Sequence, residues 1–192
     1  MVALTSCTSG GSEVGDPPQS SAALSGRDDR ATNLPFDTSF PNRWNSSNDG
    51  SAYEPCNALR VDLVELGIDA DSARDAAGTD GQTARGCEWR YLDDSPVAHW
   101  TVSQVVGNSS GLAREKARVS GTADVWLPDL RIGGRAVGVH FVKGGGDCDT
   151  YVQSGKAAVS TIVVTLDTGV PVSEICDRAI AFTRATIDKI PH

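Results

Sequence analysis

Apolar residues recur at helical spacing in three parts of the chain. In the first part, leucines occur at positions i, i+4 and i+7, and a glycine follows that can end a helix in the left-handed conformation. In the last part, a proline and a glutamate stand at the start, where a missing N–H and a negative charge are tolerated or favourable. A weaker amphipathic pattern lies between them. The sequence thus predicts helices at residues 59–66, 112–119 and 171–190.

β-branched and aromatic residues alternate with turn signals in the rest of the second half of the chain. This pattern predicts strands at residues 88–92, 98–106, 125–127, 135–142, 148–153 and 157–166. The first two are joined by Asp93-Asp94-Ser95-Pro96, which has hairpin turn chemistry. The last has imperfect alternation, as expected for a strand buried on both faces. The polar stretch from Asp69 to Arg85 is predicted to be a loop.

Strands connected by turns this short pair as antiparallel neighbours. The expected fold class is therefore α+β, with a mainly antiparallel twisted sheet and flanking helices in a single domain over residues 51–192. Residues 8–50 are rich in Ser, Gly, Pro, Asp and Asn, and this composition predicts a disordered tether. Its apolar clusters, at residues 34–36 and 40–44, either dock on the domain or meet a partner, and docking is the simpler expectation.

The five cysteines favour two disulfides and one singleton. Their spacing contains no Cys-x-x-Cys and no nearby histidine pair, which argues against a structural zinc site. Two disulfides imply an oxidising compartment, whereas the alternative is a cytosolic protein with buried free thiols. The simplest pairing joins Cys56 to Cys87 and Cys148 to Cys176, so that each bond fastens a helix to the sheet. Four cysteines nevertheless allow three connectivities.

The charge of the chain excludes one class of partner. A formal net charge of -8 and an isoelectric point near 4.8, without any cluster of Lys and Arg, argue against nucleic acid. No run of eighteen apolar residues occurs, so no segment is expected to span a bilayer as a helix. Any membrane attachment is then covalent or peripheral.

The odd cysteine lies near the start of the chain. Leu4-Thr5-Ser6-Cys7 resembles the lipobox of bacterial lipoproteins, in which the cysteine is the point of cleavage and lipidation. Only six residues precede Cys7, too few for a complete signal, so residues 1–7 are interpreted as the remnant of a lipoprotein signal. This predicts a lipid anchor on Cys7 and a location at the extracytoplasmic face of the cell membrane. The alternative is a chance cysteine in a disordered N-terminus.

Several short motifs of the domain belong together. They are Pro55-Cys56, Gly86-Cys87-Glu88-Trp89, Gly134-Arg135-Ala136 and Cys176 near the start of the closing helix. With them the chain resembles, over about residues 50 to 190, an actinobacterial lipoprotein family, domain of unknown function 3558 (DUF3558), most specifically in residues 86–89 together with the other three cysteines of the domain. The resemblance implies a lipid-anchored envelope protein and brings no activity with it.

One enzyme signature is present. Gly107-Asn108-Ser109-Ser110-Gly111 matches the Gly-x-Ser-x-Gly nucleophile elbow, and Asp124 or Asp129 and then His140 follow in the expected order. This gives the alternative hypothesis of a small secreted serine hydrolase. The elbow requires a parallel sheet with crossover helices, however, and the turns between the later strands are too short for crossovers. No catalytic residue is therefore assigned.

Metal and ligand sites have weaker signals. His99 and His140 could bind a metal together with Asp147 and Asp149, but histidines on strands are more often solvent-facing or hydrogen-bonded. The stretch Asp69-x-Asp71 with Asp75 lacks the glycine and the glutamate of a calcium loop. Neither a metal nor a cofactor is therefore expected. Three tryptophans beside strands are expected in the core or lining a cleft for a lipid or glycan, with two arginines near an anionic head group; these residues are Trp89, Trp100, Trp126, Arg131 and Arg135.

The leading functional hypothesis is a non-enzymatic binding or accessory module of the cell envelope. Such a module would contact an envelope lipid, a glycan or a membrane-protein partner through its sheet and its glycine-rich loops. A purely structural envelope protein is the remaining alternative.

Overall fold

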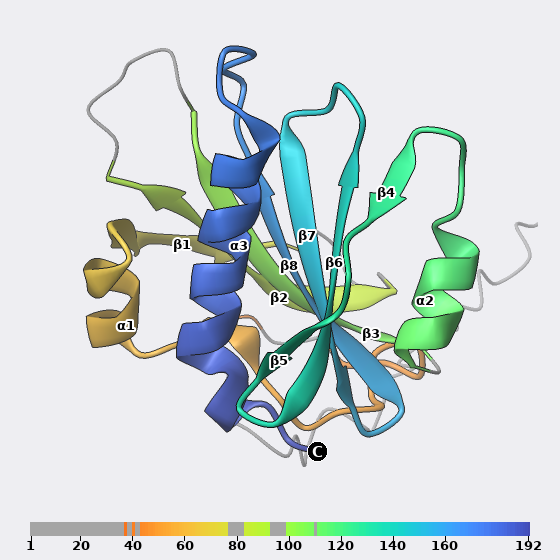
Figure 1. Cartoon of the computed structure of the whole chain (residues 1–192). Helices are drawn as coiled ribbons and strands as arrows, with labels where there is room; N and C mark the ends of the chain where they lie inside the picture. The colour runs from red at the N-terminus through yellow and green to blue at the C-terminus, as the bar shows by residue number, and fades with distance from the viewer. Residues whose placement is uncertain (1–36, 38–39, 41–42, 77–82, 93–98, 110) are drawn as a thin grey trace, which may run out of the picture.

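An antiparallel sheet of eight strands forms the centre of the molecule (Figure 1). The computed structural model describes residues 37, 40, 43–76, 83–92, 99–109 and 111–192. The strand order is β1-β2-β3-β8-β7-β6-β4, and β5 pairs with β6 beside this path. The strands are β1 (Ile68–Asp75), β2 (Ala84–Tyr91), β3 (Thr101–Asn108), β4 (Asp124–Trp126), β5 (Leu130–Ile132), β6 (Arg135–Val142), β7 (Asp147–Ser154) and β8 (Ala157–Val164).

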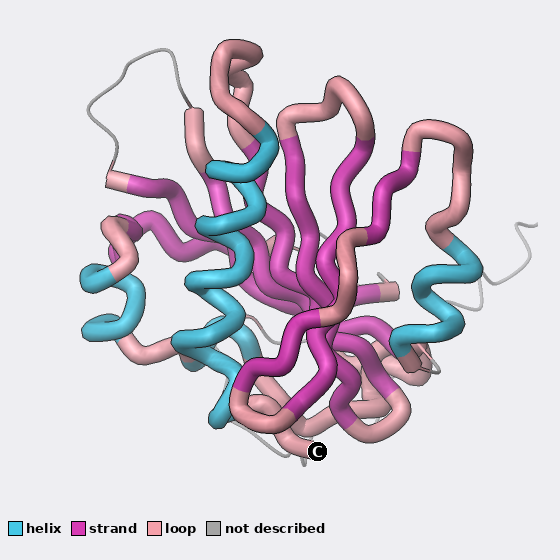
Figure 2. The backbone as a smooth tube through the Cα atoms, viewed as in Figure 1, coloured by secondary structure: helices cyan, strands magenta, loops and turns pink. Residues whose placement is uncertain are grey.

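The longest helix lies across one face of this sheet (Figure 2). The helical segments are η2 (Pro55–Asn57), α1 (Arg60–Glu65), α2 (Leu112–Arg118), α3 (Val172–Thr186) and η3 (Ile187–Lys189). α3 buries Ile175, Ala179 and Phe182, and the Phe182 ring lies 5.7 Å from that of Trp89 on β2. The core therefore sits between α3 and the central strands.

A chain of buried polar side chains runs beneath α3. The Gln104 amide donates to Thr161 and Thr186, and its oxygen accepts a hydrogen bond from the Tyr53 hydroxyl. Thr183 in turn bonds to Thr161. Buried polar groups are costly unless paired, so this network favours one position of the helix on the sheet.

The fold class agrees with the prediction. The sheet is antiparallel throughout, helices flank it, and two disulfides link the parts of the domain. The three predicted helices correspond to α1, α2 and α3, and β6 has the predicted bounds. Gly67 follows α1 with φ 70°, which is the left-handed conformation expected of it. No helix in the described part of the chain is long and apolar enough to cross a membrane.

Two strands lie where the sequence predicted none. The stretch after Asp69 was predicted to be a loop, but residues 68–75 form β1, and this prediction was wrong. β1 is the edge strand, paired only with β2 and interrupted by an irregularity between Asp69 and Arg74. Charged residues on an edge strand do not need to be buried, so the alternation that marks a strand is missing. β5 is too short to give a pattern. The turn predicted at residues 93–96 lies outside the described residues.

Residues 43–54, here called the N-terminal strap, pack against the domain. Arg43 and Asn48 are buried, although composition placed them in the tether that ends at residue 50. Phe40, just before the strap, packs against the core, and the Arg85 guanidinium lies over the Trp44 ring, as the docking expectation requires of residues 40–44. Residues 34–36, the other apolar cluster, lie outside the described residues. Composition misses residues 43–50 because buried polar side chains, such as Arg43 and Asn48, hold this part of the chain in place.

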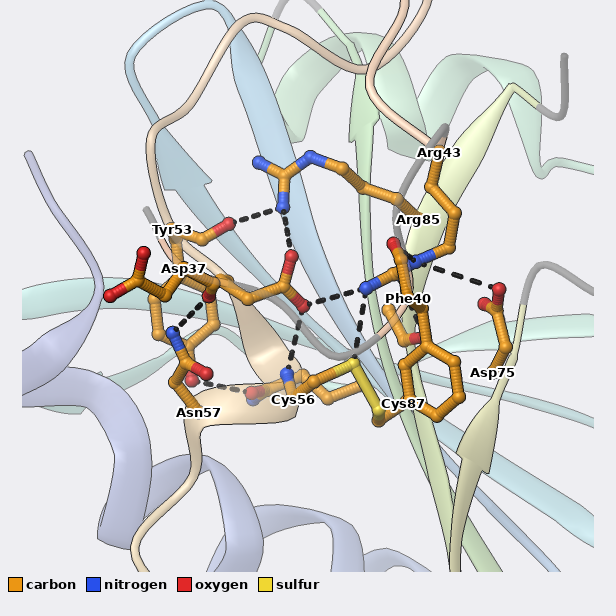
Figure 3. Close-up of a disulfide and its surroundings, with 12 residues drawn as sticks. Asp37, Phe40, Arg43, Tyr53, Cys56, Asn57, Asp75, Arg85 and Cys87 are labelled. Carbon is orange, nitrogen blue, oxygen red and sulfur yellow. Dashed lines mark hydrogen bonds and ion pairs between the residues drawn. A yellow bond between two sulfur atoms is a disulfide. The ribbon is translucent and has the colours of Figure 1, made fainter. Parts of the chain in front are cut away.

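The strap is fixed to β2 by two buried arginines (Figure 3). Arg85 donates to the carbonyls of Ser51 and Tyr53 and lies 3.4 Å from Glu54, whereas Arg43 contacts the other oxygen of Glu54 at 3.2 Å. Burial lowers the pKa of Arg85 to about 10, which leaves it cationic at neutral pH. Asp75 lies 3.5 Å from Nε of Arg43, so two carboxylates balance the two cations, and removal of any one of the four leaves a charge uncompensated.

Candidate binding site

The face of the sheet away from α3 carries a row of small residues. Ala84 on β2 pairs with Gly107 on β3, and Gly107 pairs with Ala158 on β8, so three side chains of minimal size lie side by side. The next row along the strands runs from Gly86 through Val105 to Ser160. Because these side chains are short, the surface of the sheet is depressed along this row. The hollow therefore follows from the strand register.

This hollow is a trough with a volume of about 600 Å³. One helix, α2, forms a wall of it, because α2 packs over β6 and β7 on this face, with Leu112 against Gly138. Ligand pockets commonly occupy about 300 to 1,000 Å³. The floor is formed by Ala84, Val105, Gly107, Ala158, Ser160 and Ile162. The walls and the rim are polar and are formed by Ser47, Thr83, Asn108, Ser109, Glu115, Arg118 and Tyr151.

An ion pair lies in the wall that α2 provides. Both Nε and Nη2 of Arg118 donate to the same carboxylate oxygen, Oε2 of Glu115, at 3.0 and 2.6 Å. The Glu115 side chain is only 7% exposed, whereas that of Arg118 is 65% exposed. Glu115 raises the pKa of Arg118 through this hydrogen bond. The buried acid thus positions a guanidinium whose other edge remains accessible.

A second group of ionisable side chains lies beneath α2. Nε2 of His140 is 2.9 Å from Oδ1 of Asp124, and Nδ1 is 3.4 Å from Oδ2 of Asp149. The Tyr151 hydroxyl donates to the same Asp149 oxygen, and the rings of Trp126 and His140 are 5.0 Å apart. Burial raises the pKa of Asp149 to about 6, with a further contribution from Asp147 and an opposing one from His140. A backbone hydrogen bond from Gly121, followed by the His140 contact, lowers the pKa of Asp124.

The structure does not form the predicted serine and histidine pair. Both ring nitrogens of His140 face carboxylates, and the buried Oγ of Ser109 has no hydrogen-bond partner among the described residues. β3, which leads into Ser109, pairs antiparallel with both of its neighbours, so the strand context of a nucleophile elbow is missing. Asp129 pairs with Lys116 instead. Ser109 lies at one end of the trough.

The other residues that the sequence suggested as ligands either stabilise the fold or lie outside the trough. His99 is exposed, and Asp69, Asp71 and Asp75 belong to β1. Arg135 donates to the carbonyls of Ile190 and Pro191 and so holds the C-terminal residues. Within the described ranges, no three His, Cys, Asp or Glu side chains gather as metal ligands would.

The predicted tryptophans separate into two groups. Trp89 and Trp100 are 2% and 4% exposed and belong to the core, as expected for large aromatic side chains beside strands. Trp126 lies on the other face, where its Nε1 donates to the carbonyl of Val119 and its ring faces Tyr151. Arg131 donates to the Gly134 carbonyl within its own turn. Neither arginine near Gly133 and Gly134 lines the trough.

A further recess of about 700 Å³ lies on the β1, β2 and β3 part of the sheet. Its charged side chains pair with one another, Arg74 with Glu88 and Arg90 with Asp69. The recess has exposed guanidinium groups of its own, but its lining contains no aliphatic side chain. The trough combines an apolar floor with an exposed guanidinium and is therefore the stronger candidate site.

The disulfides have the simplest of the three connectivities. Cys56 bonds to Cys87 and Cys148 to Cys176, with S–S distances of 2.08 and 2.04 Å. The second bond fastens α3 to β7, as predicted. The first fastens the short η2 turn to the middle of β2, because Cys56 precedes α1 and does not belong to it. Cys7, the predicted lipidation site, lies outside the described residues.

The trough was not predicted from the sequence. Neither Arg118, nor Glu115, nor Tyr151 was identified as a candidate. One signal existed, since Glu115 and Arg118 are three residues apart on a predicted helix, a spacing at which opposite charges meet. The row formed by Ala84, Gly107 and Ala158 becomes visible only when the register of the strands is known.

Comparison with known proteins gives a family and nothing finer. A family model described as a protein of unknown function, DUF3558, matches residues 2–189. No curated protein matches the chain, and no solved structure matches it.

Proposed function

The chain belongs to the DUF3558 family, whose function is unknown, and we propose that it is a non-enzymatic binding module of the cell envelope that holds its ligand in the trough. In this proposal, a lipid on Cys7 anchors the chain to the extracytoplasmic face of the cell membrane. The lipobox-like sequence before Cys7 supports the anchor, and the two disulfides support an oxidising compartment.

The trough is the observation that carries the proposal. Its floor is composed of small and aliphatic side chains, of which Val105, Ser160 and Ile162 remain partly exposed on the sheet. An apolar concave floor with a few polar groups at its wall is the usual composition of a ligand pocket. Sequestering an apolar ligand needs no nucleophile, which agrees with the separate positions of Ser109 and His140.

Binding of a neutral apolar fluorophore tests this function. N-phenyl-1-naphthylamine, which brightens when it leaves water, is expected to bind the full chain saturably. Ser160→Phe places a ring over the floor of the trough and is expected to weaken the binding about tenfold, because roughly 60 Å² of apolar contact is lost to the ligand.

The control is Thr101→Phe, which adds a ring of the same size on the same face of β3, two residues further from the trough than Ser103. It is expected to leave the affinity for the fluorophore unchanged. Circular dichroism shows whether both variants fold. Absent binding, or equal binding by the two folded variants, would refute the trough as a ligand site.

A further inference from the structure

We infer that the ligand of the trough is a single-tailed amphiphile with an anionic head group, whose head is bound by Arg118 and whose tail lies along the floor. This inference rests on the proposed function. It adds the polarity of the ligand, its charge and the residue that recognises the charge.

The charge follows from the wall of the trough. Arg118 is 65% exposed and is oriented by a carboxylate that it contacts through one oxygen only, so a second anion can approach the other edge of the guanidinium. A guanidinium can bind carboxylate and phosphate through two parallel hydrogen bonds. Arg114 lies one turn earlier on the same face of α2.

The basic residues of α2 contrast with the negative charge of the whole chain. The chain has a net charge of -8, yet α2 carries three basic residues, Arg114, Lys116 and Arg118, and one acid, Glu115. Lys116 is occupied by Asp129 and by the ring of Trp126. An anionic ligand is therefore repelled by the molecule as a whole, whereas the exposed edge of the Arg118 guanidinium offers it a local contact in the wall of the trough.

The tail follows from the floor. The row of Ala84, Gly107 and Ala158 crosses three strands, and Val105 and Ile162 lie beside it. An alkyl chain fits a low, narrow floor of this kind without displacing any side chain. A polar ligand would lose hydrogen bonds to water there and recover few of them, because Ser160 is the only one of the six floor residues that carries a polar side-chain atom.

The test compares amphiphiles that share a tail and differ in the head. The full chain is titrated, below micelle-forming concentrations, with dodecyl phosphate, dodecyl maltoside and dodecyltrimethylammonium, each displacing N-phenyl-1-naphthylamine. Dodecyl phosphate is expected to bind about tenfold more tightly than the other two, because one hydrogen bond between charged groups contributes about a factor of ten to the affinity.

Variants at one position identify the residue. Arg118→Gln is expected to reduce this preference, measured on the variant itself as the ratio of the affinities for dodecyl phosphate and dodecyl maltoside, to less than about threefold. Arg118→Lys keeps the charge but loses the planar pair of donors, and it is expected to keep only part of the preference. Arg184→Gln makes the same charge change at an exposed position of α3 and is expected to keep the full preference.

The outcomes separate this inference from the proposed function. If the fluorophore binds and Ser160→Phe blocks it, but the three heads bind equally, the binding function stands and the anionic ligand is wrong. If the fluorophore does not bind, both fail. A chain that binds phosphatidylglycerol vesicles but no dispersed amphiphile recognises a membrane surface, and this result overturns the single-tailed ligand.

Discussion

Asp149 is an acidic residue in a buried position, which disfavours the charged form of its carboxyl group. Its side chain is only 14% exposed, one of its oxygens has no hydrogen-bond partner among the described residues, and Asp147 lies near it. Contacts from His140 and Tyr151 offset part of this cost. Because burial dominates, the pKa of Asp149 rises to about 6. The folded state therefore binds a proton that the unfolded chain releases near pH 4.

This pKa predicts that stability falls as pH rises. Between about pH 4 and pH 6 the folded protein holds the Asp149 proton and the unfolded chain does not, so the free energy of unfolding decreases by about 1.4 kcal/mol per pH unit from this group. Asp149→Asn cannot lose a proton. The free energy of unfolding of the variant, minus that of the wild type, is expected to increase by about 2 to 3 kcal/mol between pH 4 and pH 6.5.

Urea unfolding at a series of pH values measures this difference. Ser103→Ala, which removes no ionisable group from the same sheet face, is the control and should follow the wild-type curve. A wild type and an Asp149→Asn variant with parallel curves would show that the carboxyl ionises in the folded state as it does in the unfolded chain.

At the level of elements, the sequence predicted those parts in which local pattern and final environment agree. α3 has a periodic apolar face that is buried, and β6 lies inside the sheet, so their predicted positions were close to the observed ones. β1 failed because an edge strand that carries Asp69, Asp71 and Arg74 has no apolar face to reveal it.

The candidate site was hidden for a different reason. Its floor depends on which residues of β2, β3 and β8 lie opposite one another, and its wall depends on how α2 packs over β7. Both are tertiary relations between segments distant in sequence. The alternative of a serine and histidine pair rested on order along the chain alone, which does not place Ser109 beside His140.

Gly86 shows how closely two strands approach one another. A Cβ at this position would lie 2.0 Å from the Gln104 carbonyl oxygen and 2.7 Å from the Val105 Cα, and both atoms belong to the backbone of β3. Gly86→Ala must therefore separate β2 from β3. We expect it to lower the free energy of unfolding by about 3 kcal/mol or more in urea denaturation.

The comparison variant is Gly107→Ala, on the neighbouring strand. Its added Cβ would approach the Thr83 carbonyl oxygen no closer than 3.3 Å, so a cost within about 1 kcal/mol is expected. Equal stability of the two variants would mean that the strands adjust without cost, contrary to the close packing that we describe.

At the scale of the whole molecule, the proposed anchor makes a prediction about Cys7. When the host cells are supplied with an alkyne-tagged fatty acid, the wild-type chain is expected to acquire the tag and to sediment with membranes. Cys7→Ala is expected to do neither, because thioether lipidation needs the cysteine sulfur. Ser12→Ala, beyond the lipobox-like residues, should behave as the wild type does. Tagging of the Cys7→Ala chain would place the lipid on another residue. A wild-type chain that acquires no tag would overturn the proposed anchor.

The position of the N-terminal strap has a mechanical consequence. Under the proposed anchoring, traction from the membrane enters the fold at Arg43, which contacts Glu54, the Gly86 carbonyl and the Cys56 sulfur. The load thus passes into β2, a strand hydrogen-bonded to β1 and β3 on its two sides, and across the covalent bond between Cys56 and Cys87. A pull between the anchor and a ligand held in the trough would therefore load an inner strand and a covalent bond, and not an edge strand.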